Sequence, residues 1–165
     1  MDELQFEEFI LVPSLQVINL YSPAAHILIL GTFLVESGLR FVEQKGPGNA
    51  MGFGQIEEIT YNDVLRYLNR FDKSSLKDRC LAACFYTAFP PRSSVMHNLR
   101  WAVITTRLKY LPVRQPIPKW DDAKNLAAYH RQWYNSPKGK TDVAESVKIF
   151  ERIINERRHK FEGQS

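Results

Sequence analysis

One acidic residue, Glu36, stands where it could act as a proton donor. The ten residues before it read HILILGTFLV, and Ser37 and Gly38 follow it. A helix over this apolar run would bring the Glu36 carboxyl to its C-terminus, where the helix dipole and apolar neighbours both disfavour the ionised form. We therefore expect Glu36 to keep its proton near neutral pH, as an acid that protonates a glycosidic oxygen must.

The alternative for Glu36 is an ordinary helix end. Isolated carboxylates are common there, and this one could bend into solvent or pair with Arg40. Spacing alone does not decide between the two interpretations. They differ in whether the carboxyl lies beside an open groove or on the outer surface.

The helix that would position Glu36 has clear start and stop signals. Ser22 is a good N-cap, and Pro23 suits the first helical position because an N–H there would have had no partner. Gly38 can end the helix. Almost every residue from 24 to 35 is apolar, which predicts a helix buried on most sides. A length of about fourteen residues is too short for a bilayer, which needs roughly twenty.

Glycines gather in the segment after this helix, at positions 46, 48, 52 and 54. Their density predicts a turn-rich region or a small hairpin, where the backbone can approach a ligand closely. Gln55 and Glu57 follow in alternation, so both would point to the same side of an extended segment. Glu57 could orient a substrate or serve as a second carboxylate, or it could simply begin a helix.

The residues around Glu36 and the glycine segment resemble a known family pattern. Glu36-Ser37 after an apolar helix, followed by GFGQI at 52–56, is similar to the first two motifs of the lytic transglycosylase and goose-type lysozyme group. The third motif of that group, Ala-x-Tyr-Asn, has a partial counterpart at 127–129, but His130 replaces the Asn. The segment NSPKGK at 135–140 is similar to one in lysozyme-like proteins of tailed phages.

The resemblance implies a mostly helical, lysozyme-like single domain over residues 1–165, built around a buried central helix. It implies a glycosidase that cleaves the β-1,4 bond between N-acetylmuramic acid and N-acetylglucosamine in peptidoglycan, with Glu36 as general acid and without cofactor or metal. A muramidase would use water, whereas a lytic transglycosylase would let the sugar's own 6-hydroxyl attack and form an anhydro product. The residues expected to bind the glycan strand are Ser37, Gly54, Gln55, Glu57, Tyr129, Tyr134 and Asn135.

Aromatic side chains and an amide lie close together in the segment that holds the third motif. Tyr129, Trp133, Tyr134 and Asn135 fall late in one predicted helix. Aromatic faces suit the C–H surfaces of sugars, and an amide can hydrogen-bond an N-acetyl group. Ordinary core packing is the alternative, and it is the favoured interpretation for Trp133.

The composition indicates one globular domain. The chain has 165 residues, of which 44% are hydrophobic, enough for a sizeable core. The net charge of +4 favours anionic partners, either nucleic acid or the acidic polymers of a bacterial envelope. The four histidines lack the spacing of a zinc site. Cys80 and Cys84, one helical turn apart, are expected to be small buried residues without a disulfide between them.

The amino-terminal stretch MDELQFEEF is acidic and lacks the basic region and apolar core of a secretory signal. An enzyme of this kind would be made in a host cytoplasm. It would reach the cell wall through a virion, a holin-type membrane lesion or lysis, as a bacteriophage endolysin or virion-associated protein. Its partners would be glycan strands and other phage proteins, without a membrane span or a specific nucleic acid. The competing hypothesis is an inactive lysozyme-like virion, structural or binding protein.

Hydrophobic periodicity and capping residues predict helices over most of the chain. Pro13 should divide the first of them, and a proline-rich connector is expected at 111–119. The predicted helical segments are 4–20, 21–40 with its cap and exit, 58–71, 74–85, 95–110, 123–134 and 142–159, with caps at Thr60 or Asn62, Ser74 or Ser75, Ser94, Asp121 or Asp122, and Thr141.

Overall fold

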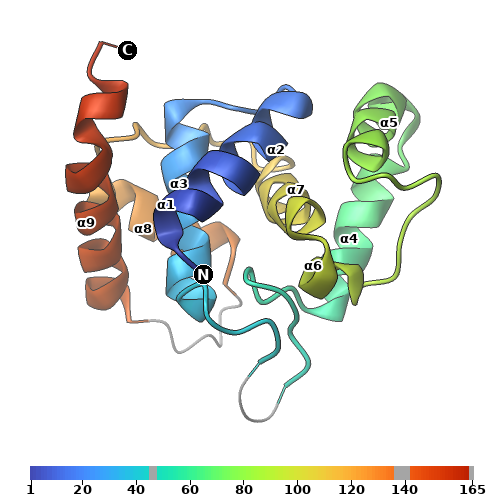
Figure 1. Ribbon diagram of the computed structural model, residues 1–165, viewed down its shortest axis with the longest axis horizontal. Helices are drawn as coiled ribbons and strands as arrows, with labels where there is room; N and C mark the ends of the chain where they lie inside the picture. The colour runs from blue at the N-terminus through green and yellow to red at the C-terminus, as the bar shows by residue number, and fades with distance from the viewer. Residues whose placement is uncertain (45–47, 136–141, 164–165) are drawn as a thin grey trace.

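The computed structural model describes residues 1–44, 48–135 and 142–163, which fold mainly as helices (Figure 1). The mostly helical class predicted from the sequence is confirmed. No helix within these ranges has the length and apolar character needed to cross a bilayer. The elements are α1 (Glu3–Phe6), the π-helical turn η1 (Glu7–Leu11), α2 (Val12–Val17), α3 (Pro23–Ser37), α4 (Glu58–Leu68), the 3-10 turn η2 (Phe71–Lys73), α5 (Ser74–Ala83), α6 (Ser94–His97), α7 (Leu99–Tyr110), α8 (Ala123–Trp133) and α9 (Val143–Phe161).

Helix α3 runs through the middle of the fold, as the apolar run predicts. The Ser22 hydroxyl accepts a hydrogen bond from the Ala25 N–H at 3.0 Å, and Pro23 occupies the first helical turn. Gly38 ends the helix with φ of +60°, a left-handed conformation that favours glycine. Ten of the fifteen residues of α3 are buried. The predicted caps and burial of this helix are confirmed.

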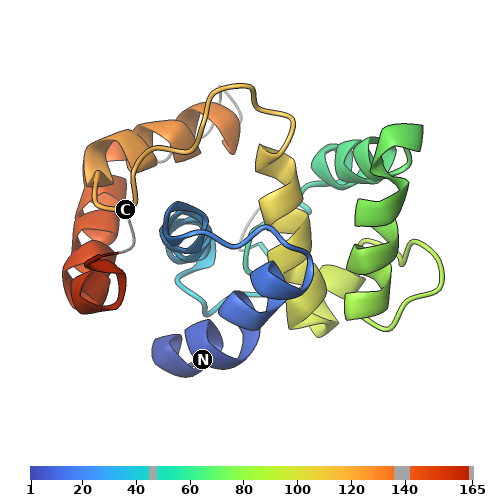
Figure 2. The same cartoon turned by 90° about the horizontal axis from the view of Figure 1, so that it is seen from above.

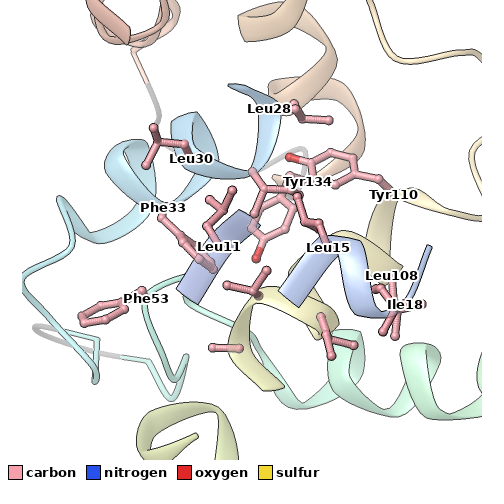
Figure 3. Packing of buried hydrophobic residues seen from close by; sticks show 14 of the residues in the cluster. Leu11, Leu15, Ile18, Leu28, Leu30, Phe33, Phe53, Leu108, Tyr110 and Tyr134 are labelled. Atoms are coloured by element: carbon pink, nitrogen blue, oxygen red, sulfur yellow. The ribbon is translucent and has the colours of Figure 1, made fainter. Parts of the chain in front are cut away.

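The other helices enclose α3 on several sides. Seen from above, α3 is viewed nearly end-on, with η1 and α2, α7, α8 and α9 around it (Figure 2). Helices α4 and α5 pack on α7, on the side away from α3 (Figure 1). Side chains of η1, α2, α3 and α7 meet in one core, to which the loop after α3 adds Phe53 (Figure 3). The labelled members of this core are Leu11, Leu15, Ile18, Leu28, Leu30, Phe33, Phe53, Leu108, Tyr110 and Tyr134.

The predicted division of the first helix at Pro13 takes the form of a wider turn and not a break. Helical structure continues from Glu3 to Val17, and η1 ends at Leu11, two residues before Pro13. Proline has no N–H to donate, and its ring crowds the carbonyl four residues earlier. A π turn, in which Val12 N–H donates to the Glu7 carbonyl, accommodates this mismatch.

A buried charge cluster joins η1 to α9. The Glu7 carboxylate, 1% exposed, accepts hydrogen bonds from Arg157 Nε at 2.8 Å and Lys160 Nζ at 2.6 Å. His26 Nε2, from α3, lies 3.2 Å from Glu7 Oε1. Burial alone would raise the pKa of Glu7, but its interactions with His26, Lys160 and Arg157 outweigh that effect and hold the pKa well below its ordinary value.

Several helix boundaries differ from the predicted ones. Glu57 occupies the N-cap position of α4, so neither Thr60 nor Asn62 caps it. The predicted helix 95–110 is interrupted, because α6 ends at His97 and the Asn98 side chain accepts from Trp101 N–H at 3.1 Å to begin α7.

Two further boundaries concern helices α8 and α9. Asp122 caps α8, as predicted, by accepting from Asn125 N–H at 3.1 Å. Helix α9 begins after Asp142, whose side chain accepts from Ala144 N–H at 2.8 Å. The predicted cap Thr141 lies outside the described residues.

The glycine segment forms a loop pinned by isolated bridges. Met51 pairs antiparallel with both Glu43 and Ile56, and no longer strand occurs in the described part of this segment. Gly52 has φ of +71°, and a Cβ there would lie 2.7 Å from the Val95 carbonyl oxygen. The predicted turn-rich region is therefore a loop that packs against α6.

Phe85 has a conformation that favours glycine. Its φ is +61° and its ring is 92% exposed. Phe85 N–H donates to the Ala82 carbonyl at 3.1 Å and Tyr86 N–H to the Leu81 carbonyl at 2.9 Å, the Schellman pattern that ends α5. We expect Phe85→Gly to raise the free energy of unfolding by about 1 kcal/mol, because glycine relieves left-handed strain of roughly 1–2 kcal/mol at some entropic cost.

Urea denaturation measures this difference, and Phe71→Gly is the matched control. Phe71 is 98% exposed, but its φ is not positive. Glycine at Phe71 adds only disorder to the unfolded chain, so this variant is expected to lose stability. Equal changes in the two variants would show that strain at Phe85 is negligible.

Gly31 allows α9 to approach α3 closely. A Cβ at Gly31 would lie 2.1 Å from Cε1 of the buried Phe150 ring. Alanine normally stabilises a helix interior by about 1 kcal/mol relative to glycine. Here we expect Gly31→Ala to lower the free energy of unfolding by about 1–3 kcal/mol, because overpacking dominates.

Urea denaturation of Gly31→Ala, with and without Phe150→Leu, tests this packing. The smaller leucine gives the new methyl group room, so the double variant should be more stable than the additive sum of the two single variants. Strict additivity would show that the Gly31 contact does not limit the approach of α9.

Candidate functional site

Glu36 is the penultimate residue of α3, and its carboxyl lies at the edge of the interior. The side chain is 16% exposed, so it is neither on the outer surface nor closed off from solvent. Its Oε1 lies 3.1 Å from Nε2 of His130, a fully buried residue of α8. Within the described ranges, Oε2 has no hydrogen-bond partner and Glu36 does not pair with the exposed Arg40.

A stack of aromatic rings holds His130 in place. The centroid of its imidazole lies 5.4 Å from that of Tyr134, with 21° between the ring planes. Tyr134 stacks on Tyr110 at 5.4 Å, and Tyr110 stacks on Tyr129 at 5.7 Å. Phe150 of α9 packs against His130 at 6.5 Å. These contacts from three helices fix the plane of the imidazole whose Nε2 meets Glu36.

Lys109 brings a positive charge into the same surroundings. Its Nζ donates to the main-chain oxygen of Tyr134 and lies 4.0 Å from the centroid of the Tyr134 ring. Burial lowers the pKa of Lys109, and the carboxylates of Glu36 and Glu57 oppose that shift. The two acidic residues thus act on one ammonium group, although they lie 21 positions apart in the sequence.

Tyr134 ties the glycine loop to the aromatic stack. Its hydroxyl donates to the Gly54 carbonyl at 2.6 Å. Burial, and secondly the charge of Glu36, raise the pKa of Tyr134, so the hydroxyl keeps the proton that it donates. A Cβ on Gly54 would lie 2.5 Å from Thr106 Oγ1 and 2.7 Å from Tyr134 Oη. Gly54 is therefore required where the loop meets α7 and the end of α8.

Two predicted binding residues direct their polar groups toward the backbone. Ser37 is buried, and its hydroxyl donates to the Phe33 carbonyl at 3.2 Å. The Gln55 side-chain amide donates to the Gly52 carbonyl at 2.9 Å and is partly exposed. The backbone N–H of Gln55 also donates to the Gly52 carbonyl, and Gln55 has φ of +47°. Its side chain and its main chain therefore both close the turn. In this conformation both side chains support the loop and helix end that flank Glu36.

The remaining predicted residues have different surroundings. Glu57 is exposed at the start of α4 and makes no side-chain cap. The Tyr129 hydroxyl donates to the Gln115 carbonyl at 3.1 Å, and the rings of Tyr110 and Tyr134 lie between Tyr129 and His130 in the stack. Asn135 is partly exposed just after α8. The rest of the predicted phage-like segment, 136–140, lies outside the described residues.

A recess of about 410 Å³ opens beside Glu36, between the end of α3 and the start of α9. Two further acidic residues, Asp142 and Glu145, line it. Asp142 is also the cap of α9, and both Asp142 and Glu145 are exposed. Gln55 is not among the described residues that line the recess. The described residues that line it are Leu34, Val35, Glu36, Asp142, Glu145, Ser146 and Ile149.

Comparison with known proteins identifies no relative. No protein-family model, curated protein or solved structure matches this chain.

Sequence reasoning missed His130 and Lys109 as neighbours of Glu36. His130 was noticed only as a departure from the third motif. Its spacing of four from Tyr134 places both on one helix face, which was a usable signal. Lys109 gave no such signal, because its electrostatic interaction with Glu36 depends on how α7 packs against α3.

The two cysteines lie away from this chemistry. Cys80 and Cys84 are free and buried in the region of α5. Burial raises the pKa of each thiol to about 12, so neither is a reactive thiolate near neutral pH. They serve as small packing residues, as the sequence predicts.

Proposed function

We propose that this protein is a peptidoglycan-degrading glycosidase with a lysozyme-like fold, in which Glu36 is the general acid. Its target would be the β-1,4 bond between N-acetylmuramic acid and N-acetylglucosamine. The position of Glu36 carries the proposal: one oxygen is held by a buried histidine, the other has no partner in the described ranges, and a recess lies beside it. A protonated carboxyl in these surroundings can reach the oxygen of a bound glycan.

The proposed reaction uses Glu36 twice. Its carboxyl gives a proton to the glycosidic oxygen while the bond from that oxygen to the anomeric carbon breaks, so that the leaving sugar departs as an alcohol. The anomeric carbon is then attacked either by water or by the 6-hydroxyl of the same sugar. In both cases the attacking group loses a proton to Glu36, which restores the acid. Water produces a reducing end, and the 6-hydroxyl produces a 1,6-anhydro end.

The two routes make different demands on the surrounding residues. A hydrolase gains from a second carboxylate that orients water or stabilises the positive charge developing on the sugar. Glu57, Asp142 and Glu145 are the candidates, because Glu57 acts on Lys109 together with Glu36 and the other two line the recess. The anhydro route needs Glu36 alone. We propose a muramidase or a lytic transglycosylase and leave this choice to the products.

Digestion of purified peptidoglycan with the purified protein tests the proposal. We expect soluble muropeptides, and mass spectrometry of their ends distinguishes reducing from 1,6-anhydro termini. A phage origin, as an endolysin or a virion-associated enzyme, is proposed on the resemblance to lysozyme-like phage proteins. The net charge of +4 favours anionic partners, among them the acidic polymers of a cell wall. Failure to release fragments from several wall types would instead support an inactive virion, structural or binding protein.

A further inference from the structure

His130 makes the only described side-chain contact to the Glu36 carboxyl, and its own surroundings restrict how it can do so. The residue is fully buried, and its Nε2 lies 3.1 Å from Glu36 Oε1. Its other ring nitrogen, Nδ1, is buried without a hydrogen-bond partner in the described residues. The two nitrogens therefore have unequal environments.

We propose that His130 is a positioning residue that carries its proton on Nε2, donates it to Oε1 and thereby directs the transferable proton of Glu36 to Oε2. The alternative tautomer would bury an N–H at Nδ1 without an acceptor, which costs about 1–3 kcal/mol. The doubly protonated ring has the same defect and adds a buried charge. The neutral ring with its proton on Nε2 donates that proton to Glu36 Oε1 and leaves no N–H of His130 without an acceptor.

This arrangement gives the two oxygens of Glu36 different tasks. Oε1 accepts the Nε2–H bond in both protonation states of the carboxyl, so the carboxyl plane does not have to turn during the reaction. Oε2, which has no partner in the described ranges, carries the proton that leaves and returns. The proposal rests on the proposed function, because it assigns the orientation of the acid in that reaction.

Several charged and titratable groups surround the pair and belong to any account of its pH dependence. Helix α7 contributes Lys109 and the Tyr110 hydroxyl, and the end of α8 contributes Tyr134. Asp142 and Glu145 approach Glu36 from α9, across the recess. The face of α9 that packs on the imidazole itself is the apolar ring of Phe150. Lys109 is thus the one cation among these named groups, and among the described residues Glu36 is the carboxylate that pairs with His130.

Two variants of His130 separate a donor from a packing residue. His130→Gln keeps an N–H that can reach Oε1 but removes the ring, whereas His130→Phe keeps a ring in the stack but removes the donor. We expect His130→Phe to lower kcat about 10- to 100-fold with little change in KM, because the acid loses its fixed orientation. His130→Gln should retain most of the wild-type kcat. The reverse order would overturn the proposal in favour of ring packing alone.

Nitrogen NMR of protein labelled at histidine gives a readout that does not depend on activity. The His130 signals are assigned by their loss in His130→Gln. We expect one protonated and one unprotonated ring nitrogen at neutral pH, with the proton on Nε2. A proton on Nδ1, alone or together with one on Nε2, would overturn the proposal. If wild-type protein released no muropeptides, the proposed function would fail. The NMR result would still show which ring nitrogen of His130 carries the proton beside Glu36.

Discussion

Protein in which Glu36 is replaced by Gln is expected to release muropeptides about 10²- to 10⁴-fold more slowly than wild type, the range typical of a lost general acid. Glutamine has nearly the shape of glutamic acid, but its amide cannot give a proton to a glycosidic oxygen. Its carbonyl can still accept the hydrogen bond from His130, which lies 3.1 Å from Oε1 in the wild type. The thermal transition should therefore stay within a few degrees of wild type.

Glu151→Gln is the matched control for this variant. Glu151 is exposed on α9 and does not line the recess beside Glu36. The same change of charge and shape at Glu151 should leave the rate of release unchanged. Undiminished release by Glu36→Gln would assign the acid to another residue. A large loss in both variants would indicate an effect of net charge on wall binding and not of proton donation.

Protein in which Glu7 is replaced by Gln is expected to lose about 1–3 kcal/mol of unfolding free energy, because the buried Arg157 loses one charged partner but keeps Glu3 and Glu156. The Arg157 side chain is 1% exposed and donates to Glu7 at 2.8 Å, so it cannot turn to solvent without opening the packing of α9. The amide of glutamine accepts one hydrogen bond but does not neutralise the charge of Arg157 or Lys160.

Urea denaturation at neutral pH measures this loss, with Glu8→Gln as the control. Glu8 is the exposed neighbour of Glu7 in the same turn, so its substitution should change stability by less than about 0.5 kcal/mol. Similar losses of unfolding free energy in both variants would show that the buried carboxylate of Glu7 stabilises the fold no more than an exposed one.

The pH dependence of the Glu7 effect has a definite sign. The pKa of Glu7 is lowered on folding, from an ordinary value of 4.5, by the cations around it. The ionised carboxylate therefore contributes its full stability above about pH 4.5, and this contribution disappears as the pH falls toward the lowered pKa. We expect the stability difference between wild type and Glu7→Gln to be constant near neutral pH and to shrink in acid. A difference that grew in acid would contradict the assignment.

The parts of the fold that could be predicted are those determined by neighbours in the sequence. Ser22, Pro23 and Gly38 set the ends of α3 through local backbone chemistry, and the apolar run between them specified burial. Asp122 gave the start of α8 in the same way. These signals act within one helical turn, so a single sequence contains them in full.

The parts that could not be predicted depend on contacts between distant segments. The pairing of His130 with Glu36 joins residues 94 positions apart, and that of Arg157 with Glu7 joins residues 150 positions apart. Asn98 divides α6 from α7 although the apolar spacing continues through it. The role of Glu36 as an acid stays a prediction, and so does binding by Ser37 and Gln55, whose polar groups close local turns in this conformation.

The contact between η1 and α9 also constrains the order in which the protein can form during synthesis. Glu7 leaves the ribosome early, yet the cations that neutralise it belong to a helix made some 150 residues later. Until then, burying the π turn would place an unpaired carboxylate in an apolar environment, at a cost of several kcal/mol. We therefore expect the first helical run to stay undocked on the nascent chain, and the final enclosure of α3 to follow only after α9 has emerged.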